Sequence, residues 1–376
     1  MSRAVLLIGD RTSANIYHYS GFVAPDPFVF ISDKRGSLVI VTELEAERAH
    51  SEARVDQVLT LESLGYDKVW ATLGSAKRAM ARIAAMVLAD HGVATVVVEP
   101  DLALIYAEEL RAAAVSLAVD ESFFVTRRRL KRPDEVDAIA ACQLAAEQVM
   151  RKVIDIIRQS EVADGYLWHG SIALTSEYLQ RVTATEFLNM GYDHNGPIVA
   201  CGPQGAQPHN HGAGQLRSGS PVVLDFFPRS AETLYHGDIT RTVWHGTCPS
   251  EVEHMFDTVL EAQQEALRTL GPGVNGRDVH RKVCSVFQRA GYGSSTRNFG
   301  RGVRKARFIH GTGHGIGLEV HEQPRINDTD VILSPGDVVT VEPGLYDLDW
   351  GGVRIEDLVV ITENGVRNLT SLQKTF

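Results

Sequence analysis

Three histidines, His310, His314 and His321, lie within twelve residues of one another, a density that packing alone does not require. Glycines occupy positions 311, 313, 315 and 317, and each glycine inside a helix costs about 1 kcal/mol relative to alanine, so a helix is excluded. In an extended strand His310 and His314 share a face, whereas His321 has the opposite parity and needs a bend or bulge to join them. The spacing therefore predicts an irregular strand whose imidazoles bind a ligand.

Four acidic residues lie in apolar, β-branched segments before and after these histidines. They are Asp225, Asp238, Glu342 and Glu356, in the segments 221–227, 237–244, 338–344 and 353–361. An isolated carboxylate is so costly to bury that it protonates instead, and four of them on apolar strands indicate a compensating cation. The alternative interpretation is a set of buried ion pairs with Arg241 and Arg354.

In chain order these residues read aspartate, aspartate, histidine, glutamate, glutamate. That order, with the flanking motifs at 238–242, 321–324, 342–344 and 353–357, resembles the metallopeptidases of the pita-bread fold, in particular the branch of prolidase and aminopeptidase P. The resemblance implies two divalent metal ions held by Asp225, Asp238, His314, Glu342 and Glu356. Four carboxylates and one imidazole favour Mn²⁺, with Co²⁺, Fe²⁺ and Zn²⁺ as alternatives.

The same resemblance implies a role for each residue. Asp238 and Glu356 would bridge the ions, Asp225 would chelate one, and His314 with Glu342 would complete the other. Two such ions can hold one water or hydroxide and polarise a carbonyl oxygen, and Glu342 would be the general base.

Four further residues are implied on the substrate side. His321 would hydrogen-bond the scissile carbonyl and stabilise the oxyanion, while His209 would approach the scissile nitrogen. His310 and Arg354 would contact substrate. The choice of His209 stays open because His194 and His211 lie near it in sequence, and Arg354 is equally well interpreted as an ion-pair partner of Glu356.

Two local features bear on the substrate. Asp225 and Asp238 are thirteen residues apart, where the resemblance implies a shorter hairpin, and we expect the longer hairpin at the pocket rim. Five cations also lie in the segment 297–307. The simpler interpretation is a solvated loop, and the alternative hypothesis is that one of its arginines, Arg297, Arg301, Arg304 or Arg307, holds the free carboxylate of a short peptide.

A chain of 376 residues exceeds what one hydrophobic core usually supports, so two domains are expected, at 1–126 and 127–376. In the first we predict strands at 4–8, 28–32, 37–41, 94–99 and 123–126 and helices at 43–52, 75–91 and 101–114, with a capping box at Thr42 and Glu45. The basic stretch 127–132 predicts a solvated linker, and Pro133 predicts the first turn of a helix reaching 157. Further helices are predicted at 171–183, 250–270 and 275–290.

The resemblance implies a creatinase-like α/β amino-terminal domain followed by an α+β pita-bread catalytic domain with two pseudo-symmetric halves.

Composition excludes several classes of protein. The net charge of −10 disfavours a nucleic-acid partner. No segment approaches the roughly 20 apolar residues of a membrane span, and the apolar run 4–8 is too short for a signal peptide, so we expect a cytoplasmic protein without a membrane partner. The four cysteines are scattered, which predicts reduced thiols.

The predicted function is a dinuclear metal-dependent exopeptidase that cleaves the bond between an N-terminal residue and proline, as a dipeptidase or an aminopeptidase. Its partner would be a short peptide with proline second, and family analogy implies a homodimer. The alternatives are a small-molecule amidohydrolase or lyase of the same fold and a non-catalytic binding module. A methionine aminopeptidase is disfavoured because it usually lacks a preceding α/β domain.

Overall fold

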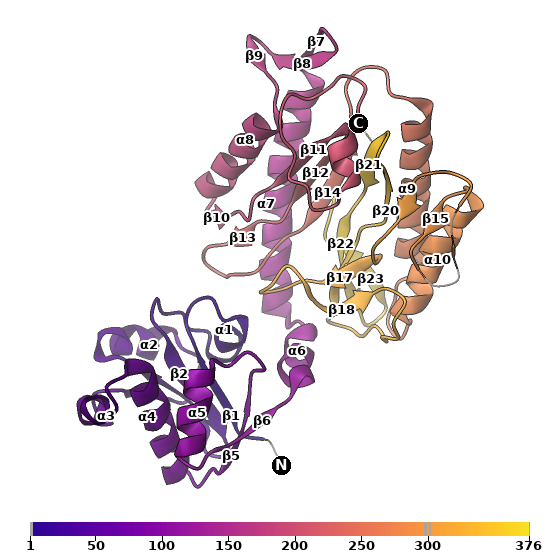
Figure 1. Cartoon of the computed structure of the whole chain (residues 1–376). Coiled ribbons are helices and arrows are strands. Elements are labelled where there is room, and N and C mark those ends of the chain that lie inside the picture. The colour runs from indigo at the N-terminus through magenta and orange to yellow at the C-terminus, as the bar shows by residue number, and fades with distance from the viewer. Residues whose placement is uncertain (1–2, 297–298, 301, 376) are drawn as a thin grey trace. The chain divides into compact units, whose positions relative to one another are not determined.

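The computed structural model describes residues 3–296, 299–300 and 302–375 (Figure 1). Contacts within the chain divide it into two compact units, Met1–Arg128 and Arg129–Phe376. This division lies two residues after the boundary that the sequence predicts.

The first unit is built on a six-stranded sheet with the order β4-β3-β2-β1-β5-β6. The strands are β1 (Val5–Gly9), β2 (Phe28–Asp33), β3 (Gly36–Val41), β4 (Gln57–Thr60), β5 (Thr95–Val98) and β6 (Ser116–Val119). The helices are α1 (Ala14–Ser20), the 3₁₀ turn η1 (Glu43–Glu45), α2 (Ala46–Glu52), α3 (Tyr66–Leu73), α4 (Ala76–Asp90), α5 (Leu104–Ala112) and α6 (Glu121–Arg129). Buried apolar residues pack on both faces of the sheet, which confirms the α/β class.

Two local predictions for this unit are wrong. Residues 123–126 lie in helix α6, where Phe124 and Arg128 are buried one helical turn apart; the strand precedes them as β6. A short apolar run does not distinguish strand from helix, and here the helical spacing of the buried positions prevails. Thr42 makes no side-chain capping hydrogen bond, and the N–H of Glu45 donates to its carbonyl oxygen at 3.0 Å.

The second unit begins with α7 (Pro133–Arg158), and Pro133 stands in its first turn as predicted. The N–H of Arg132 donates to Glu135 Oε2 at 2.7 Å and so closes the start of this helix. Three more long helices follow: α8 (Ser176–Asn189), α9 (Ser250–Thr269) and α10 (Gly276–Arg289). The last two match the predicted ranges closely, whereas α8 starts later than predicted because Thr175 caps it, its hydroxyl accepting from the N–H of Tyr178.

Two antiparallel sheets pack with these helices, the first lying between α8 and α9 in the sequence and the second after α10. The first has the order β11-β12-β14, from β11 (Ile198–Cys201), β12 (Val222–Phe226) and β14 (Ile239–Val243). The second has the order β18-β17-β19-β22-β23, from β17 (Gly313–Gly315), β18 (Glu322–Ile326), β19 (Val338–Val341), β22 (Asp357–Thr362) and β23 (Gly365–Asn368). In Figure 1, α7 and α8 lie beside the first sheet and α9 and α10 beside the second. Each half is thus a pair of helices on an antiparallel sheet, as the pita-bread fold requires.

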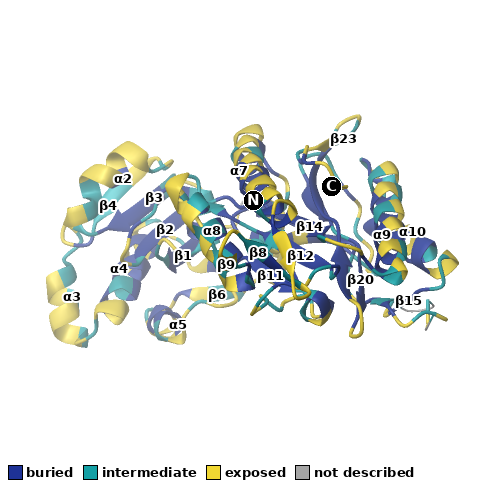
Figure 2. Cartoon of the chain, turned by 90° about the horizontal axis from the view of Figure 1, so that it is seen from above, coloured by how far each residue is buried: buried dark blue, intermediate teal, exposed yellow. Residues whose placement is uncertain are grey.

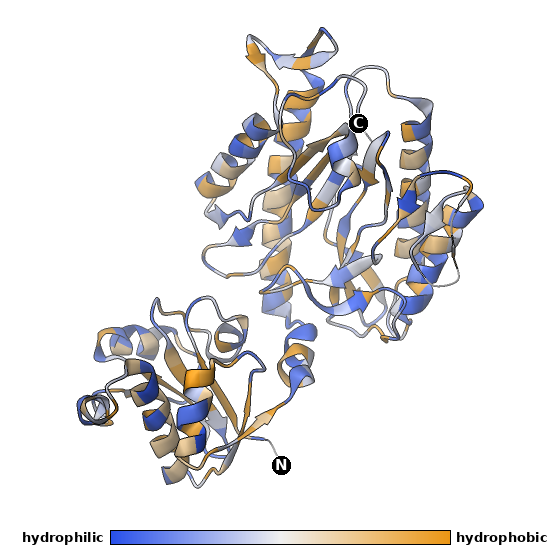
Figure 3. Ribbon diagram, in the orientation of Figure 1, coloured by the Kyte–Doolittle hydropathy of each residue, from blue (hydrophilic) through white to orange (hydrophobic). Residues whose placement is uncertain are grey.

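Smaller elements complete the second unit. A four-stranded sheet joins β15 (Gly293–Ser294), β16 (Arg307–Phe308), β20 (Gly344–Asp347) and β21 (Gly351–Arg354). A small sheet holds β7 (Glu161–Ala163), β8 (Tyr166–His169) and β9 (Ile172–Ala173), β10 (Tyr192–Asp193) pairs with β13 (Arg229–Ser230), and η2 (Gly202–Ala206) follows β11. Figure 2 shows the central strands buried and the helices exposed on one side, and Figure 3 shows apolar and hydrophilic faces along α7.

The basic segment before α7 is not the solvated linker that the sequence predicts. Arg129 donates to both carboxylate oxygens of Asp337, at 2.7 and 2.6 Å. Lys131 Nζ lies 2.6 Å from Glu322 Oε2, and both side chains are buried. The acidic partners lie far away in the sequence, so the local pattern of charges does not reveal them.

A buried arginine on β14 fastens the last described residues to the core. Arg241 is fully buried; its Nη2 donates to Leu372 O at 2.7 Å and to Asp357 Oδ1 at 3.0 Å, its Nε donates to Gln373 O, and its Nη1 donates to the carbonyl of Glu356. Asp357 therefore has a structural role. The four cysteines are unpaired, and within the described ranges no helix has the length and apolar character of a membrane span.

Candidate metal centre

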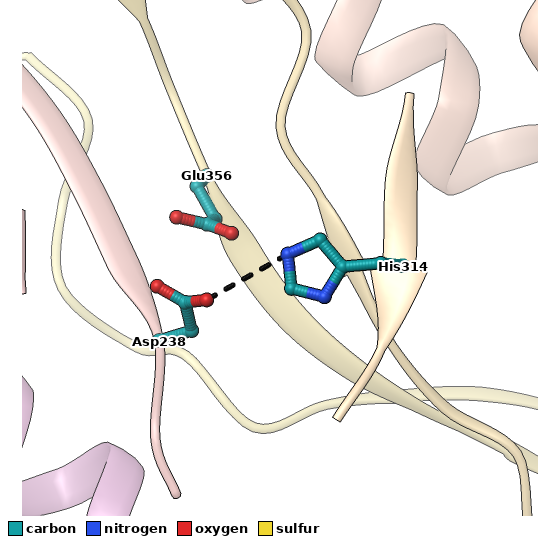
Figure 4. A group of neighbouring side chains, drawn as sticks. All are labelled: Asp238, His314 and Glu356. Carbon is teal, nitrogen blue, oxygen red and sulfur yellow. Dashed lines mark ion pairs between the residues drawn. The ribbon is translucent and has the colours of Figure 1, made fainter. Parts of the chain in front are cut away.

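The five residues of the predicted ligand set stand at the ends or middles of strands from both halves. Asp225 lies in β12, Asp238 precedes β14, His314 is the middle residue of β17, Glu342 follows β19, and Glu356 precedes β22. Asp238, His314 and Glu356 place ligand atoms within 4.8 Å of one another and point toward a common centre (Figure 4). His314 Nε2 also lies 3.4 Å from Glu342 Oε1. The fold thus gathers residues that are far apart in the sequence.

Hydrogen bonds join the two halves at this point. The N–H of Glu356 donates to Thr240 O at 3.0 Å, and the Thr240 hydroxyl donates to Glu356 Oε2 at 2.8 Å. The N–H of Glu342 donates to Thr312 O at 2.8 Å. These contacts fix the two glutamates that follow or precede their strands, where the backbone is otherwise free to turn.

Strand β17 is irregular in the way the sequence predicts. The pairing register with β18 shifts between His314 and Gly315. A Cβ on Gly313 would lie 1.9 Å from Thr340 O, so only glycine allows β19 to approach this closely. The bulge turns the chain so that His321, of opposite parity, also comes near, with its ring centroid 4.4 Å from that of His314.

His314 is oriented as a neutral ligand. Its Nδ1 lies 3.1 Å from the carbonyl oxygen of Gly315 and donates to it, which leaves the Nε2 lone pair facing Asp238. Burial lowers the pKa of His314 to about 3. A neutral imidazole with one nitrogen held by a backbone carbonyl is a common arrangement for a metal-binding histidine.

The two carboxylate oxygens of Asp225 differ in their hydrogen bonding. Its Oδ2 accepts from Arg354 Nη2 at 2.7 Å, while its Oδ1 is buried and has no hydrogen-bond partner among the described residues. The ion-pair interpretation therefore accounts for one oxygen only. Arg241 pairs with Asp357 and not with a member of the ligand set.

The remaining acids lack compensating cations within the described part of the chain. Asp238, Glu342 and Glu356 form no ion pair with a lysine or arginine there, and Asp238 and Glu356 are buried. Burial, followed by repulsion from neighbouring carboxylates, raises the pKa values of Asp238 and Glu356 well above the ordinary range. Burial also raises the pKa of Glu342 to about 7. An oxygen-rich donor set with one imidazole and a buried oxygen without a partner fits divalent cations.

A cavity of about 910 Å³ opens over these acids. His209, His211, His310, His321 and Arg354 line it. His321 is exposed to solvent, but desolvation by the cavity wall lowers its pKa. The structure thus brings every predicted substrate-side residue to the same cavity. His209 and His211 are both exposed at its edge, so the geometry does not separate them.

Two of these residues are already committed to contacts within the protein. The Nδ1 of His310 lies 2.7 Å from Gly311 O and donates to it, so its Nε2 accepts from the Tyr346 hydroxyl at 2.7 Å. Arg354 donates to Asp225, to Tyr346 and to Thr240. Both side chains shape the cavity, and their polar groups hold other residues in place.

Sequence reasoning missed Arg325, which lies on β18 directly opposite His314 and also lines the cavity. Within the described residues Arg325 forms no ion pair with a carboxylate. By contrast, Arg304 pairs with Glu251, and neither Arg304 nor Arg307 lines the cavity. The hypothesis that these two bind a carboxylate is therefore not supported, and Arg297 and Arg301 of the same segment lie outside the described residues.

The long hairpin between Asp225 and Asp238 reaches the cavity only at its start, where Phe227 contributes to the lining. Further on it turns inward: the Tyr235 hydroxyl donates to Glu135 at 2.6 Å, and the N–H of His236 donates to Gly317 O at 2.9 Å. The start of the hairpin therefore borders the pocket as predicted, whereas residues near its end pack against α7 and the loop after β17.

Comparisons with known proteins agree with this geometry. Residues 137–363 match metallopeptidase family M24. The chain is 28% identical over 365 residues to an Xaa-Pro dipeptidase of Pyrococcus furiosus, covering 96% of this chain and 92% of that protein. It is 30% identical over 289 residues to an Xaa-Pro dipeptidase of Pyrococcus horikoshii, covering 76% and 75%.

Solved structures resemble the whole chain. A prolidase from Pyrococcus horikoshii superposes with a TM-score of 0.78 at 25% identity, covering 99% of this chain and 94% of that chain. An X-Pro aminopeptidase from Thermotoga maritima superposes with a TM-score of 0.81 at 25% identity, covering 100% and 97%. The gathered acids and histidine, the family match and these likenesses together identify the chain as a member of metallopeptidase family M24, with the fold of its prolidases and X-Pro aminopeptidases.

Proposed function

We propose that this protein is a metal-dependent exopeptidase that hydrolyses the bond between an N-terminal residue and proline, with dipeptides as its preferred substrates. The observation that carries the proposal is a cavity lined by the five potential ligands and by Arg325, which has no ion-pair partner among the described residues. The relatives named Xaa-Pro dipeptidase support the choice of proline.

Asp225, Asp238, His314, Glu342 and Glu356 would hold two divalent ions, for which the carboxylate-rich set favours Mn²⁺ over Co²⁺, Fe²⁺ and Zn²⁺. When bound, such ions supply an activated water and polarise the scissile carbonyl. The free Oδ1 of Asp225 and the Nε2 of His314 are the two atoms of the set whose surroundings most directly support this assignment.

The side chains around the acids would transfer the protons and stabilise the developing negative charge. Glu342, which lines the cavity beside His314, would accept the proton of the attacking water. His321, beside His314, donates a hydrogen bond to the carbonyl oxygen as negative charge develops there. His209, at the edge of the cavity, delivers a proton to the departing proline nitrogen, and His211 is the alternative donor.

Arg325 sets the length of the substrate. A guanidinium forms strong, paired hydrogen bonds with a carboxylate, and the proline of a dipeptide carries its free carboxylate one residue from the scissile bond. Apolar side chains in the same cavity, Phe227, Ile309 and Val320, suit the proline ring. A longer peptide would place an uncharged peptide group beside Arg325.

We also infer a cytoplasmic homodimer. Four unpaired cysteines, three of them buried, support a reducing compartment. Exposed apolar side chains at Leu348 and Trp350 support a protein partner on the second unit, and the family analogy suggests that this partner is a second copy. The net charge of −10 supports a partner other than nucleic acid.

The test is a reconstitution experiment. Chelator-stripped protein is reloaded with Mn²⁺ and assayed against Xaa-Pro dipeptides, Xaa-Pro-Xaa tripeptides and matched peptides that lack proline. Metal-dependent cleavage of the dipeptides ahead of the other two sets is expected. Cleavage of tripeptides ahead of dipeptides would indicate an aminopeptidase. Two bound metals without cleavage of any peptide would contradict the proposal and favour a small-molecule amidohydrolase.

A further inference from the structure

We propose that the buried ion pair between Lys131 and Glu322 positions His321, so that a lysine preceding α7 controls the rate of hydrolysis. Lys131 touches neither the cavity nor a proposed ligand; it acts through the loop that carries His321. The inference rests on the role of His321 in the proposed function, but its structural part can be tested without any activity.

The carboxylate of Glu322 stabilises the loop that carries His321 by accepting hydrogen bonds from within it. Its Oε1 accepts the N–H groups of Leu318 at 3.1 Å and Glu319 at 3.2 Å. Its Oε2 accepts from Lys131 Nζ at 2.6 Å. Glu322 directly follows His321 and is the first residue of β18. The hydrogen bonds of its carboxylate therefore also fix the direction of the backbone at His321.

Lys131 is itself held from both sides. Its N–H donates to Gly336 O at 2.9 Å, and Leu130 bridges to Asp337. The side chains of Lys131 and Glu322 are only 2% and 3% exposed. A buried charge without its partner is strongly destabilising, so neither side chain can leave the other while the loop keeps this shape.

The space inside the loop is full. A Cβ on Gly317 would lie 2.7 Å from Glu322 Oε2 and 2.9 Å from Lys131 Cε. The carbonyl of Gly317 accepts the N–H of His236 from the long hairpin. Any loss of the ion pair must therefore move the loop, and His321 with it, whereas the ligands on β12, β17 and β22 keep their own hydrogen bonds.

The experiment uses the full-length, metal-loaded protein and the variants Lys131→Met, Glu322→Gln and His321→Ala. Lys152→Met is the matched control, because Lys152 forms an exposed ion pair with Glu186 over a similar distance of 2.7 Å. For Lys131→Met we expect kcat to fall roughly 10- to 100-fold, the range for residues that orient a site, with KM and the content of two metals per chain unchanged. Lys152→Met should leave kcat unchanged.

A double-mutant cycle separates positioning from general damage. If Lys131 acts through His321, adding Lys131→Met to His321→Ala should change kcat by less than about twofold. Losses that multiply, or a loss of bound metal in Lys131→Met, would overturn the proposal. If Lys131→Met does not fold, the double variant Lys131→Met/Glu322→Gln replaces it in the same double-mutant cycle, because it leaves no unpaired buried charge.

Hydrogen exchange supplies the readout that needs no substrate. The amides of Leu318 and Glu319 should exchange faster in Lys131→Met than in the parent and in Lys152→Met, while those of β19 stay protected. Unchanged exchange at both amides would refute the positioning role. If the parent protein is inactive but the loop exchanges faster in Lys131→Met than in the parent, only the proposed peptidase function is refuted.

Discussion

Arg354 Nη2 donates to Asp225 Oδ2 at 2.7 Å, and the other oxygen of the same carboxylate is buried and has no hydrogen-bond partner in the described part of the chain. The protein neutralises one side of Asp225 and leaves the other side for a cation. The remaining nitrogens of Arg354 donate to Tyr346 and Thr240, so the guanidinium is held rigidly at three points. The proposed ligand and its arginine thus form one unit.

Replacing this arginine should weaken metal binding. Arg354→Met removes the hydrogen bond that orients Asp225, and we expect the affinity for one of two Mn²⁺ ions to fall roughly 10- to 100-fold. Isothermal titration of chelator-stripped protein measures both sites. Arg367→Met, at an exposed position on β23, is the control. Equal affinities in parent and variant would show that Asp225 needs no orienting partner.

Removal of metal should make stability depend on pH above neutrality. Burial raises the pKa of Glu342 to about 7 and those of Asp238 and Glu356 well above their usual range, so the folded metal-free chain binds protons that the unfolded chain has lost. The free energy of unfolding should then fall as pH rises from 7 to 8.5. His314, whose pKa is lowered from 6.5, is neutral in the folded state and largely neutral in the unfolded state there, so it opposes the trend only weakly.

Denaturant melts of stripped and Mn²⁺-loaded protein at pH 7 and 8.5 measure this difference. The loaded protein should show a much smaller loss of stability, since the cation replaces the protons. Calorimetry in buffers of different ionisation enthalpy should show proton release on Mn²⁺ binding that decreases as pH rises. A stripped protein that becomes more stable toward pH 8.5 would contradict the assignment of these carboxylates.

Arg325 should determine the preference for a free carboxylate. A charge-assisted hydrogen bond contributes roughly 1.5–3 kcal/mol, so Arg325→Met should raise KM for an Xaa-Pro dipeptide by roughly 10- to 150-fold. The KM for the corresponding dipeptide amide should change little. Arg304→Met, which alters an arginine paired with Glu251, serves as the matched variant. A parallel rise in KM for acid and amide would assign Arg325 to a general structural role.

Gly313 should tolerate no side chain. Its Cβ would lie 1.9 Å from Thr340 O, so Gly313→Ala must push β17 away from β19 and move His314. We expect the free energy of unfolding to fall by about 1–3 kcal/mol and the affinity for metal to fall as well. Gly271→Ala is the control, because its Cβ would make only an ordinary contact with Val274 at 3.7 Å. Similar melting temperatures for the two variants would exclude a close approach at Gly313.

The elements that present the proposed ligands could be predicted because each signal is local. An acid next to a β-branched run, or a histidine between glycines, is visible in a window of a few residues. The bulge in β17 follows from the opposite parities of His314 and His321. These features depend on strand geometry alone.

Other features depend on partners that are remote in the chain. Lys131 and Glu322 are 191 positions apart, so a buried ion pair looked like a solvated linker. Arg325 has no distinguishing neighbour in the sequence; only its pairing opposite His314 places it in the cavity. The segment 123–126 was misassigned because a short apolar run fits a strand and a helix equally well.

The contacts of Arg241 have a consequence for synthesis of the chain. This residue holds the carbonyl of Glu356 together with those of Leu372 and Gln373, which lie beyond the whole proposed ligand set. During translation the second unit cannot fix the carbonyl of Glu356 in this way until Leu372 and Gln373 have left the ribosome. A nascent chain stalled before Leu372 emerges should therefore retain less Mn²⁺ than one stalled after Gln373 emerges.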